Sequence, residues 1–304
     1  MKPPDSFLHG GLKLANDQGH GDAPPVETKR KPWWLYVHLL GLDAPLVAVV
    51  WLLLFAKTWR VNYHPWEAYV ALALVAWTVR IAAKLLGAEM EGMAGSFEMR
   101  HRAALKRSAM LTGAASLILT VLNFPLSVYN YLLVGGILVL GYFALALFSS
   151  NSKNEVSYAK HVLSGITFAY GVALVAHVYL PDKGIRELVK SSEFISFAVM
   201  CLLASAAMEL WAHSRSSADY EVKAADEITL SLPLTLLGAA ALVFAVKNES
   251  MNARPFFYGI LTGAALLQVL NRMRSRFRLE TLKILILVCL LAPGLVFLAY
   301  ELSQ

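Results

Sequence analysis

The chain is short of charged residues. Lys, Arg, Asp and Glu together make up 16% of its 304 residues, and the mean hydropathy is +0.54. A soluble domain carries about 25% charged residues. Several apolar runs reach the roughly 18 to 20 residues that are needed to cross the hydrocarbon core of a bilayer. The composition therefore excludes an ordinary soluble protein and predicts a polytopic helical membrane protein.

Cysteine and the common catalytic motifs are also scarce. Cys201 and Cys289 both lie inside apolar runs, and we interpret them as small buried residues rather than as a disulfide or a metal site. The sequence has no Gly-rich phosphate loop, no HExxH zinc motif, no CxxC pair and no Ser/His/Asp constellation that can be argued from spacing. It also has no pair of Asp-rich motifs for magnesium diphosphate. The net charge of +6 is distributed between apolar runs rather than gathered in a basic tract, so we expect no nucleic-acid partner and no metal site.

The composition divides the chain into two parts. Residues 1–32 are polar, rich in Gly, Pro and Asp, and without the apolar stretch of a signal peptide, so we expect a flexible cytoplasmic tail. Residues 33–304 are expected to form one all-α domain of about nine transmembrane helices in a single bundle. The predicted spans are residues 34–56, 66–87, 108–124, 129–148, 158–180, 193–213, 228–247, 256–270 and 279–301.

The distribution of basic residues predicts the orientation. The tail and the loops on the side of the N-terminus contain sixteen Lys and Arg residues. The loops on the other side contain seven, including Lys247 at the end of a span. Short loops rich in Lys and Arg stay in the cytoplasm. We therefore expect an integral protein of a bacterial inner membrane, with a cytoplasmic N-terminus and, after nine spans, an external C-terminus.

Two cations in the second span are the main candidates for a site. Arg80 and Lys84 are four residues apart, which places them on one helical face, and a cation at membrane depth seldom faces lipid. Glu209, followed four residues later by His213, is the carboxylate that we expect to pair with one of them. The alternative is that Glu209 only reaches the interface from its helix end. For Asp43, which precedes Pro45, a helix-capping role is at least as strong an interpretation as a catalytic one.

The chain resembles the UbiA superfamily of membrane prenyltransferases. The resemblance is carried by the nine predicted spans, by the opening GLDAPLVAVVWLLLFA, and by the region that would hold the family motif NDxxDRxxD, here residues 79–87. Of the defined motif positions, only the basic one has a residue of the same kind here, Lys84. The three Asp positions are occupied by Arg80, Ala83 and Gly87, and the second Asp motif is reduced to Glu209 with acidic residues beyond it. The following Arg100 and Arg102 look like the family's basic loop.

The resemblance implies a fold and a changed function. The family's transferases hold an isoprenyl diphosphate through two magnesium ions, and Ala83 and Gly87 offer no oxygen ligand. We therefore expect a catalytically degenerate member without a cofactor. It would bind a membrane lipid, isoprenoid or quinone in a central cavity near Arg80, Lys84, Arg100, Arg102, Glu209 and His213, or serve as a subunit in a complex of membrane proteins.

Two alternatives remain open. The first is a divergent, magnesium-dependent prenyltransferase that moves an isoprenyl group from its diphosphate to an aromatic or lipid acceptor. The second is a small-molecule transporter, which is less well supported because the sequence shows no inverted repeat and no paired broken helices.

Overall fold

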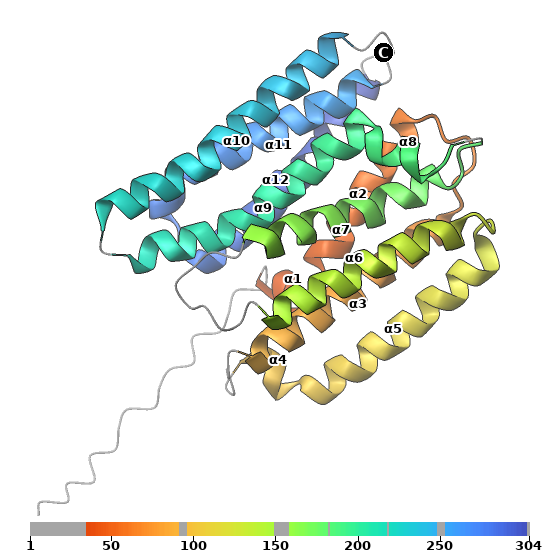
Figure 1. Ribbon diagram of the computed structural model, residues 1–304, viewed down its shortest axis with the longest axis horizontal. Helices are drawn as coiled ribbons and strands as arrows, with labels where there is room; N and C mark the ends of the chain where they lie inside the picture. The colour runs from red at the N-terminus through yellow and green to blue at the C-terminus, as the bar shows by residue number, and fades with distance from the viewer. Residues whose placement is uncertain are drawn as a thin grey trace, which may run out of the picture. The chain divides into compact units, whose positions relative to one another are not determined.

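The computed structural model describes residues 35–90, 96–148, 158–181, 183–217, 219–247 and 253–302. All regular structure in these ranges is helical (Figure 1). The predicted tail, residues 1–32, lies outside the described residues. The helices belong to one compact unit, Trp33–Gln304. Their bounds are α1 Leu35–Leu39, α2 Asp43–Thr58, α3 Trp66–Met90, α4 Phe97–Arg100, α5 Arg102–Asn123, α6 Val128–Phe148, α7 Tyr158–His177, α8 Ile185–Lys190, α9 Ser192–Ser216, α10 Tyr220–Lys247, α11 Arg254–Met273, the 3₁₀ turn η2 Arg274–Arg276 and α12 Leu279–Leu302.

Seven of the described helices are long and apolar enough to cross a membrane: α3, α5, α6, α7, α9, α10 and α12. The protein is therefore a polytopic α-helical membrane protein. The other two predicted spans correspond to α2 and α11. With 16 residues, α2 is only about 24 Å long, which is shorter than the hydrocarbon core. The polar residues Gln268 and Asn271 interrupt the apolar character of α11. The count of nine spans remains a prediction.

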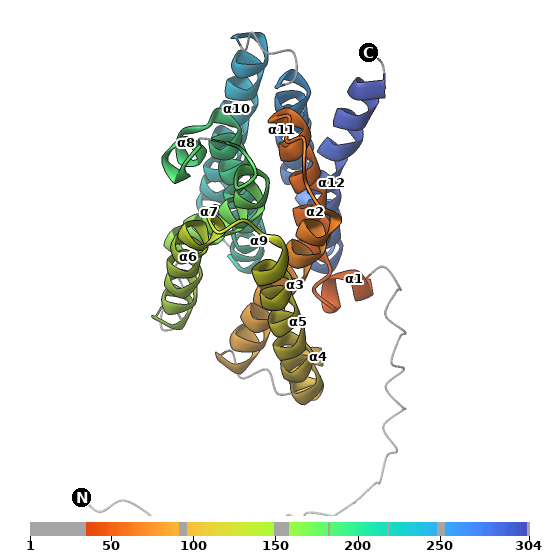
Figure 2. The same cartoon turned by 90° about the vertical axis from the view of Figure 1, so that its right-hand side faces the viewer.

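The short helix α2 lies at the centre of the bundle, where it packs on α3, α7 and α12 (Figures 1 and 2). Trp51 and Phe55 in its middle are fully buried. The indole of Trp51 stacks on Phe197 of α9 at 4.3 Å between ring centroids, and its Nε1 donates to the carbonyl of Leu290 in α12 at 2.9 Å. Close packing and interhelical hydrogen bonds, rather than the hydrophobic effect alone, hold helices together in lipid. This core explains how a helix shorter than the bilayer is retained.

Helices α5 and α6 differ from the rest in having few neighbours. The tight turn around Pro125 joins them, but α5 packs on α3 whereas α6 packs on α7. Figure 2 shows the two helices diverging from that turn. Of the described side chains of α6, only Val128 and Tyr131 in its first turn are buried. Most of the apolar surface of this hairpin is therefore left for lipid or for a ligand.

Candidate functional site

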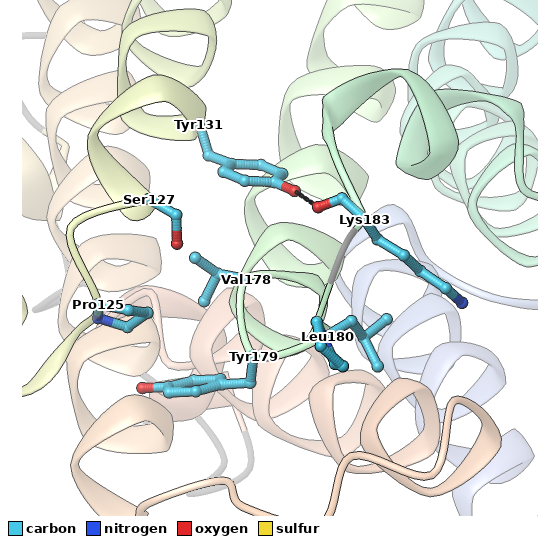
Figure 3. Close-up of a pocket in the computed structure, with 8 residues that line it drawn as sticks. Pro125, Ser127, Tyr131, Val178, Tyr179, Leu180 and Lys183 are labelled. Atoms are coloured by element: carbon cyan, nitrogen blue, oxygen red, sulfur yellow. Dashed lines mark hydrogen bonds between the residues drawn. The ribbon is translucent and has the colours of Figure 1, made fainter.

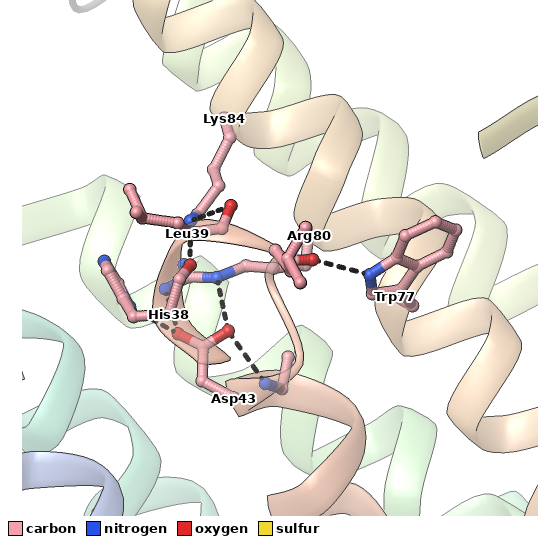
Figure 4. Close-up of polar contacts among 8 residues, drawn as sticks. His38, Leu39, Asp43, Trp77, Arg80 and Lys84 are labelled. Carbon is pink, nitrogen blue, oxygen red and sulfur yellow. Dashed lines mark hydrogen bonds and ion pairs between the residues drawn. The ribbon is translucent and has the colours of Figure 1, made fainter. Parts of the chain in front are cut away.

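The predicted cations Arg80 and Lys84 lie on α3 beside a sharp bend between α1 and α2 (Figure 4). Gly41 in this bend has a φ of +71°, a left-handed conformation that favours glycine. A Cβ at this position would also approach the Cδ1 of Ile81 to 3.1 Å. A residue with a side chain would thus strain the backbone and crowd α3. The bend brings the end of α1 and the start of α2 together against α3.

Arg80 is bound to Asp43, the first residue of α2. Its Nη2 lies 2.6 Å from Oδ2 of Asp43, and its Nε lies 3.3 Å from Oδ1. His38 of α1 contacts the same carboxylate through Nδ1 at 3.0 Å, and the backbone N–H of Ala44 donates to Oδ1. The fork geometry of a guanidinium matches a carboxylate in this way. Asp43 is therefore the counter-ion of Arg80.

Lys84, one turn further along α3, binds main-chain groups instead of a carboxylate. Its ammonium donates to the carbonyl of His38 and, at 3.3 Å, to that of Leu39. These carbonyls lie at the C-terminal end of α1, where a cation is favourable because the partial negative charge of the helix dipole lies there. The carbonyl of His38 also accepts from the backbone N–H of Gly41 at 3.1 Å. Trp77, one turn before the ion pair, donates from Nε1 to the carbonyl of Leu40 at 2.7 Å. Three side chains of α3 thus hold the α1–α2 bend. We call His38, Asp43, Arg80 and Lys84 the bend cluster.

The structure contradicts the predicted pairing of Glu209 with Arg80 or Lys84. Glu209 on α9 instead contacts Nε2 of His161 on α7. The prediction failed because Glu209 and the two cations belong to helices that are not neighbours in the bundle, which helix spacing alone does not indicate. The capping interpretation of Asp43 is also wrong in detail, since the N-cap residue is Leu42 and makes no side-chain cap.

The other predicted site residues do not join the bend cluster. His213 contacts Asp226 of α10 at 2.9 Å between Nδ1 and Oδ2. Arg102, at the start of α5, pairs with Glu89 at the end of α3. The side chain of Arg100 on α4 is exposed. Sequence reasoning missed His38, which is five residues before Asp43 across the bend. Only the glycine between them pointed to a turn that brings the two side chains together.

One nitrogen of the Arg80 guanidinium is not engaged by Asp43. Its Nη1 makes no hydrogen bond within the described part of the chain, and 37% of its side chain is exposed. The phenol of Tyr142 on α6 lies within electrostatic range. For Lys84, the groups in range include Glu98 of α4 and Lys283 of α12. Within the described part of the chain, the bend cluster therefore offers one unused hydrogen-bond donor, Nη1 of Arg80.

A separate cavity of about 480 Å³ lies at the other end of the bundle, between the α5–α6 turn and the segment after α7 (Figure 3). Tyr131 donates to the carbonyl of Lys183 at 3.2 Å and contacts Nδ1 of His177 at 2.9 Å. Tyr179 also lines the cavity. The cavity is open to the surface of the protein. The hydroxyl of Tyr131 in its wall is already engaged with Lys183 and His177.

The fold is that of a polytopic helical membrane protein, and the bend cluster is a partly buried ion-pair network where α1 and α2 meet α3. No group of three or more His, Cys, Asp or Glu side chains that could hold a metal ion occurs among the described residues. Comparison with protein-family models, with curated proteins and with solved structures finds no match to this chain.

Proposed function

We propose that the protein is a UbiA-like membrane bundle that binds an anionic lipid or isoprenoid and does not transfer prenyl groups. The observation that carries this proposal is the bend cluster. At the position of the first aspartate motif, Arg80 replaces an acidic metal ligand with positive charge, and Lys84 keeps the motif's basic position beside it. The positive charge of both residues and the open Nη1 of Arg80 favour an anionic head group, such as a phosphate, over a metal ion.

The carboxylate nearest to the motif does not favour magnesium. Asp43 is held by both Arg80 and His38 and receives the N–H of Ala44 as well, so its oxygen atoms are already occupied. Magnesium requires near-octahedral oxygen ligation, and Ala83 and Gly87 supply no oxygen atom. Ionisation of an allylic diphosphate without the metal loses several kcal/mol of charge stabilisation.

The divergence of α5 and α6 supports a lipid as the ligand. The apolar sides of these helices are exposed, with Leu133 at 65%, Ile137 at 62% and Leu140 at 71% on α6. A hydrocarbon tail beside α6 would have its head group at the level of Tyr142 and Arg80. We further propose nine spans, a cytoplasmic bend cluster and a bacterial inner-membrane location, because the basic residues are enriched on that side.

Two measurements test the proposal. First, the protein is purified in a mild detergent, and bound lipids are identified by native mass spectrometry and extraction. We expect a phosphate-bearing lipid or isoprenoid that is depleted in Arg80→Gln. Arg186→Gln, on the exposed face of α8, is the matched control and should retain the lipid. Equal retention in both variants would contradict the role of the bend cluster.

The second measurement is turnover of isoprenyl diphosphates of several lengths with magnesium and a panel of aromatic acceptors. We expect no product. Magnesium-dependent product that disappears in Lys84→Ala would overturn the proposal in favour of a divergent prenyltransferase. A stable protein that co-purifies without lipid would instead favour the role of a subunit in a membrane complex.

A further inference from the structure

Outside the bend cluster, a serine, a histidine and a glutamate form a continuous hydrogen-bonded chain across α7 and α9. Nδ1 of His161 lies 2.9 Å from the hydroxyl oxygen of Ser205, and Nε2 of the same ring contacts Oε2 of Glu209. Ser205 and Glu209 are four residues apart on α9, so they share the face that meets α7. This acid–base–hydroxyl order is the one that activates serine nucleophiles on unrelated folds.

When Glu209 is ionised and His161 is neutral, the hydrogen-bond partners determine which ring nitrogen carries the proton. An ionised carboxylate only accepts, so Nε2 of His161 carries the hydrogen and donates it to Glu209. In a neutral imidazole the other nitrogen, Nδ1, then has a free lone pair. The hydroxyl of Ser205 therefore donates to Nδ1. His161 is thus held in the tautomer that can remove a proton from Ser205, and Glu209 stabilises the imidazolium that results.

A close helix crossing fixes this geometry. Gly165, one turn after His161, meets Leu202 on α9, and a Cβ at Gly165 would lie 2.5 Å from the backbone nitrogen of Leu202. The absence of a side chain lets the two backbones approach, as small residues do in membrane bundles. His161 is only 7% exposed, so its ring is held by packing as well as by hydrogen bonds.

The position in the membrane indicates the class of substrate. The apolar span of α7 begins at Ala159, so His161 lies in the first turn of this span, near the boundary between hydrocarbon and head groups. Carboxyl-ester linkages of membrane lipids occupy this boundary. The side chain of Glu209 is 36% exposed, so the chain of hydrogen bonds reaches the surface of the α7–α9 pair rather than being sealed in the core.

We propose that Ser205 is an activated nucleophile that cleaves carboxyl esters of membrane lipids. Its Oγ forms a bond to the ester carbonyl carbon while its proton passes to Nδ1 of His161. The carbon–oxygen bond to the alcohol then breaks, and His161 returns the proton to the departing alcohol oxygen. Water adds to the acyl-serine with His161 again as the base, which releases the fatty acid and restores the hydroxyl of Ser205.

The test uses the full chain in detergent micelles and an alkyl fluorophosphonate, a probe that labels activated serines covalently. We expect the adduct on the peptide that contains Ser205 and none in Ser205→Ala. His161→Gln, which keeps a hydrogen-bonding side chain but no base, should slow labelling by about 100-fold or more. Ser196→Ala, a buried serine on the same helix, is the control and should label like the native chain.

A companion assay measures fatty acid released from phosphatidylcholine vesicles. Release by the native chain and not by Ser205→Ala is expected. Labelling without release would overturn the lipid-ester substrate. An unlabelled Ser205 in folded native protein, or equal labelling in His161→Gln, would overturn the nucleophile, leaving the three groups as a bridge between α7 and α9. Thermal unfolding midpoints establish that each variant is folded. Lipid retention at Arg80 is independent of all these outcomes.

Discussion

Breaking the ion pair between Asp43 and Arg80 should destabilise the protein measurably. We expect Asp43→Asn to lower the free energy of unfolding by about 2 kcal/mol, between the roughly 0.2–1 kcal/mol of an exposed pair and the roughly 3–5 kcal/mol lost when a buried pair is broken. The intermediate value follows from exposure, since the side chain of Asp43 is 14% exposed and that of Arg80 is 37% exposed. Asparagine keeps the shape of the side chain, so the loss reports on charge.

A double-mutant cycle isolates the interaction. Asp43→Asn, Arg80→Gln and the double variant are unfolded by titration with a denaturing detergent in mixed micelles. If the pair is coupled as the geometry indicates, the double variant should lose less stability than the sum of the two single variants, by at least about 1 kcal/mol. Strictly additive losses would refute the reasoning, because the two side chains would then contribute independently.

The same helix supplies the control. Lys57, near the other end of α2, pairs with Glu301 at 3.6 Å, and these side chains are 47% and 35% exposed. Such a pair contributes about 0.2–1 kcal/mol at most. Lys57→Gln should therefore leave the unfolding midpoint nearly unchanged. A loss as large as that of Asp43→Asn would mean that any charge removed from α2 is costly, and the bend cluster would have no special role.

Three further predictions test packing, pH dependence and topology. Gly165→Ala should cost about 1–3 kcal/mol because its Cβ overlaps the backbone of α9, whereas Gly136→Ala, with no atom within 4 Å of its Cβ, should change stability by less than about 0.5 kcal/mol; unfolding in mixed micelles compares them. The backbone N–H groups at the start of α8 lower the pKa of Glu187 below its usual value. The ionised carboxylate therefore stabilises α8 fully above the pKa of Glu187 in the unfolded chain, and this stabilisation is lost as the pH falls through the lower pKa of the folded chain. Protection of the α8 amides from hydrogen exchange should fall as this stabilisation is lost, and Glu187→Gln should abolish the pH dependence of that protection. Finally, Gln304→Cys should react with an impermeant maleimide from outside the cell, and labelling only from the cytoplasm would exclude an odd number of spans.

The sequence by itself determined the class of the protein and most of its helices. Few charges and long apolar runs predict membrane helices because the bilayer leaves the backbone no other way to pair its polar groups. The cost of a cation at membrane depth singled out Arg80 and Lys84 without any structure. Both cations are engaged in the bend cluster, although not with the predicted partner Glu209.

Only the tertiary structure decided which groups those partners are. Helix periodicity places residues on faces but does not say which helices are neighbours, so it predicts a pair of Glu209 with Arg80 or Lys84, whereas in the fold Glu209 on α9 contacts His161 on α7. Asp43 reaches Arg80 because Gly41 adopts a left-handed conformation and turns α1 back toward the start of α2. Likewise, the chain from Ser205 to Glu209 exists because Gly165 lets two helix backbones approach closely, a contact between segments about 40 residues apart that local sequence does not encode.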